Sequence, residues 1–529
     1  MTGSPAPLTV AIAAPHRAAI DSARQAVLDG GTAIDAAIAA AVALTVVYPH
    51  QCSLGGDLVA LVRRGGHTRA VVSVGSAPAA IDVARLATES RMPRQGPDTV
   101  TVPGVVAGWL ALAELGAVLP LAAAFERAAT LADGGTVVSA GLARAIEERR
   151  ENVLADPGLA EIFTSDGEPL TEGMALPQPA LAATLRTLAA DPSAMYTGAP
   201  AEAIAARIGS LGGSLSPADF AAHRAETTDA VSAEISGTTW FVAPPPTQGL
   251  VLFGVLPAAL TEAVWSGEEA DSDATQRLLA AFVAAADSRQ RNLGDPRGGP
   301  IDETALLGDS LGEATGAFPR PGHALGDTVA ITVQDSDGTV VSLIQSVYQW
   351  FGSGILDPAT GIVLHNRGSA FSTDPRHPAR VGGGLRPPHT LCPLIGDSPE
   401  LTVAFGCQGG SAQPWILAQV ASALMDRHSD PVEVLGRPRW VIGSQDLGHS
   451  VLTVVAEPGC EVAVAAGRAQ GIAVDRRDGF IDEAGHVQVV RRVPGSLDFD
   501  AASDPRADGS VAIVRVPRGL AEFTPQGES

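Results

Sequence analysis

The amino-acid sequence predicts an α+β fold in which residues 8–300 are mostly helical and residues 328–516 are rich in strands. Three observations support this prediction. Helical segments alternate with glycine turns in the first part, whereas short β-branched runs separated by turns dominate the second part. In addition, 46% of the residues are hydrophobic but only 4% are aromatic. Such a core is built from small side chains, which suits closely packed layers.

The first part is expected to contain helices and one early β-hairpin. A helix over residues 22–28 ends at Gly30-Gly31, and Thr32 is the expected N-cap of the next helix, which runs to residue 47. The expected elements that follow are a glycine turn at 53–57, strands at 58–62 and 70–74 with a turn at 63–66 between them, a helix containing Trp109, and helical stretches at 176–208 and 250–287.

The second part begins with a strand pair. The expected elements are strands at 329–333 and 340–344 joined by a turn at 335–338, strands at 401–405, 450–455 and 511–516, and a helix at 412–425. The boundary between the two parts falls in a turn-rich stretch at 318–323. The change in composition there indicates either two domains or one domain assembled from two halves.

The charged residues exclude several classes of function. All 35 basic residues are arginines, so a P-loop lysine and a Schiff-base lysine are both impossible. The formal net charge of −23 argues against a nucleic-acid partner and against docking on anionic lipid. We therefore expect neither nucleic acid nor a membrane as a partner.

Cysteine and histidine spacing indicates no metal site and no cofactor. The four cysteines are scattered without a CxxC pair, and the eleven histidines lack HxxxH and HExxH spacing. The N-terminal residues have neither a basic nor a sustained apolar segment, so we expect no secretory signal there. The expectation is a cytoplasmic protein with reduced thiols.

An ordered series of short motifs goes beyond this general description. The series consists of Gly30-Gly31 with Thr32 to Ala37, Tyr48-Pro49-His50, Gly55-Gly56, Thr101 to Gly104, Gln178 to Leu181, Gly212-Gly213, Pro244 to Gly249, Ala286 to Arg289, Gly294-Asp295-Pro296, Gly326-Asp327-Thr328, Gln345-Ser346, Phe351 to Gly354 and Gly409-Gly410. In this order and spacing, the sequence from about residue 10 to about residue 520 resembles the γ-glutamyltransferase family of N-terminal-nucleophile hydrolases. No single motif is specific, but the series is.

The resemblance implies a four-layer αββα sandwich formed by both halves of the chain. It also implies a proenzyme that cuts itself between Asp327 and Thr328 into a large subunit, 1–327, and a small subunit, 328–529. The two subunits of one precursor would then be partners of each other, and the other partner would be a small-molecule amide substrate that bears a carboxylate. A family role in glutathione metabolism is also compatible with the resemblance.

Thr328 is the expected nucleophile of such an enzyme. As the first residue of a chain, Thr328 has its own α-amino group beside its hydroxyl, and that amine has an ordinary pKa of about 7.7–8.0. The amine can take the hydroxyl proton and return it to the leaving group. By the resemblance, Ser346 hydrogen-bonds the nucleophile, and the N–H groups of Gly409 and Gly410 form the oxyanion hole.

The residues that recognise the γ-glutamyl group of the substrate in the family are largely replaced in this sequence. The arginine that precedes an Ala-Pro pair is missing from residues 72–78, and Ala370 replaces the aspartate that binds the α-amino group. Tyr348 replaces an asparagine, and His389-Thr390 replaces a serine pair. We assign Tyr348, His389 and Thr390 to substrate binding by their positions.

The small-subunit segments around Arg367 resemble the oxamate amidohydrolase-like branch of the family. These segments are Asn366 to Ser372, Asp374-Pro375 with His377-Pro378, and Arg386 to Leu391. In that branch Arg367 replaces a glutamine, and a guanidinium there, together with His389, would anchor a carboxylate on the acyl part of the substrate. The sequence leaves open whether Arg367 instead pairs with a carboxylate of the protein.

The sequence therefore predicts an amide hydrolase or acyltransferase with an N-terminal threonine nucleophile. A γ-glutamyl substrate is the conventional expectation, and an oxamate-type small amide is the alternative. A third hypothesis is an uncleaved, inactive relative that only binds ligand, because Val329-Ala330 follows Thr328 where the family usually has Thr-His.

Overall fold

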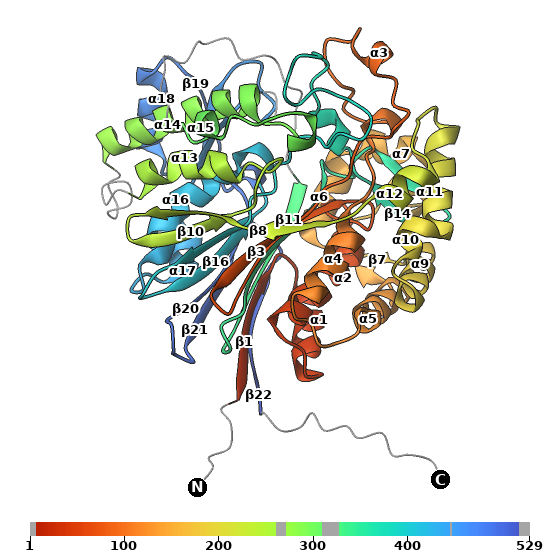
Figure 1. Ribbon diagram of the computed structural model, residues 1–529, viewed down its shortest axis with the longest axis horizontal. Helices are drawn as coiled ribbons and strands as arrows, with labels where there is room; N and C mark the ends of the chain where they lie inside the picture. Colours follow the sequence, from red (N-terminus) through yellow and green to blue (C-terminus); the bar gives the residue numbers. More distant parts are fainter. Residues whose placement is uncertain (1–6, 261–270, 309–326, 445–446, 518–529) are drawn as a thin grey trace.

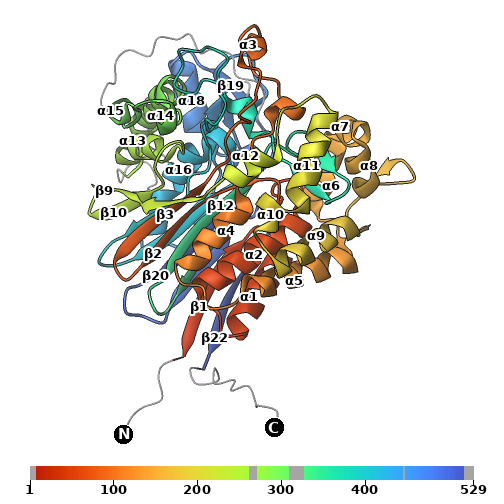
Figure 2. The same cartoon turned by 45° about the vertical axis from the view of Figure 1, so that its right-hand side comes forward.

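Two β-sheets lie face to face at the centre of the molecule, and helices cover the outer face of each sheet (Figure 1). The computed structural model describes residues 7–260, 271–308, 327–444 and 447–517. Turning the molecule by 45° shows the two helical layers on opposite sides of the paired sheets (Figure 2). The expected four-layer αββα sandwich is thus confirmed.

The first sheet contains strands from both halves of the chain. Strands β11 and β12, from the second half, lie between β1 and β2 of the first half, and β22 pairs with the outer side of β1. In sheet order the strands are β22 (Ser510–Val516), β1 (Leu8–Ala14), β11 (Asp327–Asp335), β12 (Val340–Tyr348), β2 (Asp57–Arg64), β3 (His67–Ser73) and β8 (Glu226–Asp229). The two halves therefore build one fold rather than two separate domains.

The second sheet has six antiparallel strands. In sheet order they are β21 (Phe499–Ser503), β20 (Val487–Arg492), β16 (Thr402–Cys407), β15 (Leu394–Asp397), β10 (Thr238–Val242) and β9 (Val231–Ile235). A cluster of small and branched side chains fills the space between the sheets; it includes Val59, Ala330, Ile344, Ile395 and Ala404. The low aromatic content is consistent with this close approach of the sheets.

The helices of the first outer layer lie mainly on the first sheet. Helix α2 is buried along its whole length, and Thr32 and Asp35 form a capping box at its start, which confirms the predicted N-cap. The helices from this half are α1 (Arg17–Leu28), α2 (Ala33–Val47), α3 (Val83–Leu86), α4 (Val105–Glu114), α5 (Leu121–Gly134), α6 (Ala140–Glu148), α7 (Arg150–Ala155), α8 (Pro157–Phe163), α9 (Pro179–Ala190), α10 (Ala194–Thr197), α11 (Ala199–Ser210) and α12 (Pro217–Ala222).

The second outer layer is a smaller group of helices over the second sheet. Its central member, α16, packs on β16 and against α13. The helices are α13 (Gly249–Ala259), α14 (Ser272–Asn292), α15 (Glu303–Leu306), α16 (Gln413–Met425), α17 (Pro431–Leu435) and α18 (Glu461–Ala469). The short strands outside the two large sheets are β4 (Thr136–Val137) with β7 (Ala175–Leu176), β5 (Thr164–Ser165) with β6 (Glu168–Pro169), β13 (Ile355–Asp357) with β14 (Ile362–Leu364), and β17 (Trp440–Gly443), β18 (Thr453–Ala456) and β19 (Ala473–Arg476).

The first half contains more strands than the sequence predicts. Strand β1 and strands β8, β9 and β10 lie in the stretch that was expected to be mostly helical. Residues 9–14 of β1 are all buried, so the strand lacks the alternation of polar and apolar residues that identifies a half-exposed strand. The expected boundary at 318–323 lies outside the described residues. Within the described residues, no helix is both long and apolar enough to cross a membrane.

Candidate active site

Thr328 is the second residue of the central strand β11, and it is buried. Its hydroxyl donates a hydrogen bond to Ser346 Oγ on the neighbouring strand β12, at 3.1 Å. The pairing of β11 with β12 shifts register between Asp327 and Val329, so that Thr328 sits at an irregularity in the sheet. The structure brings the two expected hydroxyls together, and their catalytic roles remain a prediction.

Gly409 and Gly410 follow strand β16 and lead through the 3₁₀ turn η5 (Gly410–Ala412) into α16. Their φ angles are 142° and 51°, and a Cβ on Gly409 would come within 2.3 Å of Ile416 Cδ1. Glycine is therefore required at this turn. Among the hydrogen bonds of the described residues, neither N–H has an acceptor within the protein. Both donors are available for an oxyanion.

Gln248 connects this turn to the segment of Thr390, a role that the sequence did not reveal. Its buried amide Nε2 donates to the carbonyl of Thr390 at 2.6 Å and to the carbonyl of Gly410 at 3.0 Å. The residue lies in the Pro244 to Gly249 motif of the recognised series, but its type alone indicates no function. Only the tertiary structure shows that it joins two loops of the site.

Arg367 lies in the 3₁₀ turn η4 (Arg367–Ala370) and is 1% exposed. Its Nη2 donates to Thr390 Oγ1 at 3.0 Å, and its guanidinium carbon lies 3.6 Å from the centroid of the Tyr348 ring. Nη1 has no partner, and no described carboxylate is within ion-pair distance of this arginine. Burial lowers its pKa to about 10. Of the two hypotheses for Arg367, the geometry favours a ligand carboxylate over one from the protein.

Asp57, which sequence reasoning missed, is a buried carboxylate beneath these groups. It pairs in register with Ser346, and its Oδ2 lies 3.2 Å from His389 Nε2 and 3.4 Å from His365 Nδ1. Burial opposes its ionisation, but the contacts with His365 and His389 outweigh burial and hold its pKa well below the usual range. The only signal in the sequence was an acidic residue directly after Gly55-Gly56, at the start of an apolar strand.

His389 has both ring nitrogens engaged by the protein. Burial and then the charge of Arg367 lower its pKa to about 3, so the imidazole is neutral and its contact with Asp57 is a hydrogen bond from Nε2–H. Its Nδ1 accepts the N–H of Leu391 at 3.3 Å. The geometry therefore supports a positioning role for His389, and its contact with substrate stays a prediction.

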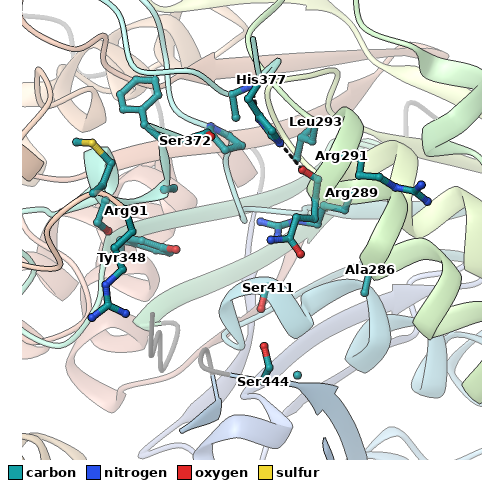
Figure 3. A pocket seen from close by; sticks show the side chains of 18 of the residues that line it. Arg91, Ala286, Arg289, Arg291, Leu293, Tyr348, Ser372, His377, Ser411 and Ser444 are labelled. Carbon is teal, nitrogen blue, oxygen red and sulfur yellow. Dashed lines mark hydrogen bonds between the residues drawn. The ribbon is translucent and has the colours of Figure 1, made fainter. Parts of the chain in front are cut away.

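A pocket of about 440 Å³ opens beside the site. Figure 3 shows Tyr348 and Arg91 on one side of this pocket, Arg289 and Arg291 of α14 on the other, and Ser411 with Ser444 between them. Four segments of the site each add a residue to the wall: Tyr348 at the end of β12, Ala370 at the end of η4, Pro388 before His389, and Ser411 after Gly410. Tyr348 has a φ of 79°, which is uncommon for a residue with a side chain. Tyr348 lines the pocket, and the buried guanidinium of Arg367 lies over one face of its ring.

The predicted site residues thus form one connected network, because Ser346 Oγ, which accepts from Thr328, also accepts the N–H of Tyr348 at 2.8 Å. Thr328 contacts Ser346, Arg367 contacts both Thr390 and Tyr348, and the oxyanion turn is tied to Thr390 through Gln248. Asp327 occupies the first position of β11, and its side chain lies outside the described part of the structure. Cleavage between Asp327 and Thr328 remains a prediction.

Comparison with known proteins identifies the relatives of this chain. A family model described as Gamma-glutamyltranspeptidase matches residues 19–514. The chain is 34% identical to an oxamate amidohydrolase proenzyme of Klebsiella pneumoniae, over 94% of this chain and 97% of the relative. It is 33% identical to a glutathione hydrolase-like proenzyme, YwrD, of Bacillus subtilis, over 82% of this chain and 85% of the relative. The crystal structure of a cephalosporin acylase from Bacillus halodurans has a TM-score of 0.84 at 28% identity and covers 97% of both chains.

Proposed function

Because the chain belongs to the gamma-glutamyltranspeptidase family, we propose that it is made as a proenzyme and cuts itself between Asp327 and Thr328. The products would be chains of residues 1–327 and 328–529. Strand β11 would then begin with the new N-terminus while still held between β1 and β12 by backbone hydrogen bonds. The cut would leave the two chains associated in one sandwich.

The mature protein would act as an amide hydrolase or acyltransferase through Thr328. The free α-amino group takes the proton of the hydroxyl, Oγ1 bonds to the amide carbon, and the N–H groups of Gly409 and Gly410 bind the resulting oxyanion. Collapse breaks the C–N bond, and the α-ammonium returns the proton to the leaving amine. Water, activated by the same amine, then hydrolyses the ester and frees Thr328. One such oxyanion donor is commonly worth about 10²–10³ in rate.

The acyl group of the substrate would be small and would bear a carboxylate. The observation behind this proposal is the guanidinium of Arg367, which is buried, is held by Thr390, and has no partner at Nη1. A buried charge without a counter-ion is costly, and a ligand carboxylate would offset that cost. Ala370 lines the pocket where a γ-glutamyl enzyme has an aspartate for the substrate's amino group. Oxamate, the amide of oxalic acid, meets these requirements better than a γ-glutamyl group.

Two assays on the purified protein test the substrate proposal. Ammonia release from oxamate is compared with release of p-nitroaniline from its γ-glutamyl derivative. Activity on oxamate alone supports the carboxylate-bearing small acyl group. Activity on the γ-glutamyl compound alone would contradict it and would restore the family's conventional substrate.

A denaturing gel with N-terminal sequencing tests maturation. Two bands that sum to the 53.7 kDa chain, with a new N-terminus at Thr328, support the proenzyme. A single persistent band with no turnover of either substrate favours the third hypothesis, a relative that binds ligand without cleavage.

A further inference from the structure

One carboxylate oxygen of Asp57 contacts two different segments of the site. Its Oδ2 lies 3.2 Å from His389 Nε2 and 3.4 Å from His365 Nδ1, and both histidines are fully buried. The other oxygen, Oδ1, accepts the N–H of Gly75 at 3.1 Å. Burial favours the neutral acid, but the contacts with the two histidines hold the pKa of Asp57 well below its usual range. The carboxylate is therefore charged, and it is the one group that joins the two histidines.

The two segments meet again at the guanidinium of Arg367. His365 stands two residues before Arg367 in the chain. His389 directly precedes Thr390, and Thr390 Oγ1 accepts a hydrogen bond from Arg367 Nη2 at 3.0 Å. The contacts thus form a closed ring, which runs from the carboxylate through each histidine and along each segment to this hydrogen bond. A shift of Asp57 would reach Arg367 from both sides.

The carboxylate does not neutralise the guanidinium that it helps to hold. Among the described residues, no ion pair joins Asp57 to Arg367, and Arg367 Nη1 has no partner. Burial and the charge of Arg367 lower the pKa of His389 to about 3, so this histidine joins the two segments without adding a charge of its own. A direct contact between Asp57 and Arg367 would occupy the guanidinium. The contacts through histidine leave it available to a ligand carboxylate.

The sheet also ties Asp57 to the predicted nucleophile. Asp57 is the first residue of β2 and pairs in register with Ser346 of β12. Residues directly opposite each other in paired strands have their side chains on the same face of the sheet. Ser346 Oγ accepts the hydrogen bond from Thr328. Asp57 is therefore fixed relative to the hydroxyl pair by its backbone and linked to Arg367 by its side chain.

We propose that Asp57 is a positioning residue for substrate recognition: through His365 and His389 it holds Arg367 where the guanidinium can bind the carboxylate of the acyl group. This inference rests on the proposed function, since it takes Arg367 as the carboxylate anchor. An Asp57 that only stabilised the fold would affect all substrates alike. An Asp57 that positions Arg367 affects a substrate with an acyl carboxylate far more than one without it.

Oxamate and oxamide are the matched pair of substrates that tests this, since oxamide has a neutral carboxamide in place of the carboxylate. The mature enzyme should have a kcat/KM at least about tenfold higher for oxamate, the effect of one charge-assisted contact. Asp57→Asn should reduce this preference at least about fivefold and change kcat/KM for oxamide much less. The reason is that an asparagine has one acceptor oxygen where Asp57 offers two, so its NH₂ group would face the N–H of Gly75 or of His389.

A double-mutant cycle shows whether Asp57 acts through Arg367. In an Arg367→Met background, Asp57→Asn should change the ratio of the two kcat/KM values by less than about twofold. Asp335→Asn is the matched control, because Asp335 is a buried aspartate at the far end of β11 whose Oδ1 accepts the N–H of Thr339 at 2.9 Å. This control should lower stability in urea unfolding and leave the ratio unchanged.

Two variants of His365 decide the inference if Asp57→Asn does not fold. The ring Nε2 of His365 lies 2.9 Å from the Thr101 carbonyl, and its Nδ1 faces Asp57. A glutamine amide reaches the position of Nε2, and an asparagine amide reaches that of Nδ1. His365→Gln should therefore reduce the preference for oxamate, whereas His365→Asn should retain more of it. The reverse order, or an equal loss in both variants, would contradict the inference.

An equal loss on both substrates in Asp57→Asn would overturn the inference, as would an undiminished effect in the Arg367→Met background. Equal hydrolysis of the two amides by the wild type would remove the carboxylate anchor and the inference with it, and would leave the chemistry of Thr328 intact. If neither amide is hydrolysed, the proposed function fails, and calorimetry with oxamate and oxamide decides the inference separately. Tighter binding of oxamate that is weakened in Asp57→Asn would support it, and equal or absent binding of the two would refute it.

Discussion

Replacing Gln248 by leucine removes the amide that ties the Gly409-Gly410 turn, the proposed oxyanion hole, to the segment of Thr390. Leucine has a similar volume, so the change deletes two hydrogen bonds with little change in packing. The Gly410 carbonyl still accepts the N–H of Gln413, whereas the Thr390 carbonyl has no other donor among the described residues. One net hydrogen bond at about 1 kcal/mol and one bare buried carbonyl at about 1–3 kcal/mol give a destabilisation of about 2–4 kcal/mol.

The catalytic effect of Gln248→Leu should exceed what this destabilisation explains. Without the hydrogen bond from Gln248 Nε2, the Gly410 carbonyl is held less firmly and its N–H can shift. One oxyanion donor commonly increases the rate by about 10²–10³, and a displaced donor loses part of that increase, so kcat should fall by about tenfold or more. The assays are urea unfolding at one protein concentration and kcat on the active substrate at a temperature where the variant is folded.

Gln419→Leu provides the matched control. Gln419 is also a buried glutamine whose Nε2 donates to two carbonyls, those of Trp415 at 2.9 Å and Trp440 at 2.7 Å, but it joins α16 to β17 rather than two loops of the site. Both variants should be destabilised, and only Gln248→Leu should lose kcat. Equal kcat in the two variants would refute the positioning role of Gln248.

Four further predictions concern single groups. Thr328→Ala should give a single uncut band on a denaturing gel and no turnover; a cut, active variant would disprove the nucleophile. Arg367→Met should lower kcat/KM for oxamate by about 10- to 100-fold, the loss of a charge-assisted contact, and an unchanged value would exclude it as the anchor. Gly409→Ala should abolish turnover because alanine is strained at the φ of 142° found there, which would displace the proposed oxyanion donors, whereas Gly479→Ala, whose Cβ would meet no atom within 4 Å, should be active. Burial lowers the pKa of His50 to about 3. Below about pH 6.5, the unfolded chain therefore binds a proton at His50, whereas the folded chain does not. Stability should therefore fall as pH drops below 6.5, and His50→Gln should lose about 2 kcal/mol less than the wild type between pH 7 and 5 in urea unfolding.

The elements that the sequence predicted best have a local cause. The start of α2 follows from the capping pair of Thr32 and Asp35, and the β2–β3 hairpin from the glycines of its turn. Strand β1 was missed because a strand buried on both faces has no alternation, and only its partners β11 and β22 show its position. Whether the halves form one fold is likewise decided by pairing between residues hundreds of positions apart.

The site residues also divide into those that the sequence could predict and those that only the tertiary contacts reveal. Thr328 and Ser346 could be named because they stand in a motif series, and the structure places their hydroxyls in contact. Gln248 and Asp57 could not be named, since a buried glutamine or aspartate has meaning only through its partners. For His389, the family resemblance predicts a substrate contact by position, but only the tertiary structure shows that both ring nitrogens contact the protein.

The order of strands in the first sheet dictates the order of events in the life of the protein. Reading across that sheet, strands from before and after position 327 alternate: β22 and β11–β12 come from one side, and β1 and β2–β3–β8 come from the other. A sheet interleaved in this way is completed most readily by one continuous polypeptide, whose two parts are present in equal number and at high effective concentration. Folding would therefore precede the proposed cut, and a mature enzyme, once separated into its two chains, would lack the covalent link that makes assembly intramolecular. Under this proposal the backbone bond before Thr328 would aid assembly once.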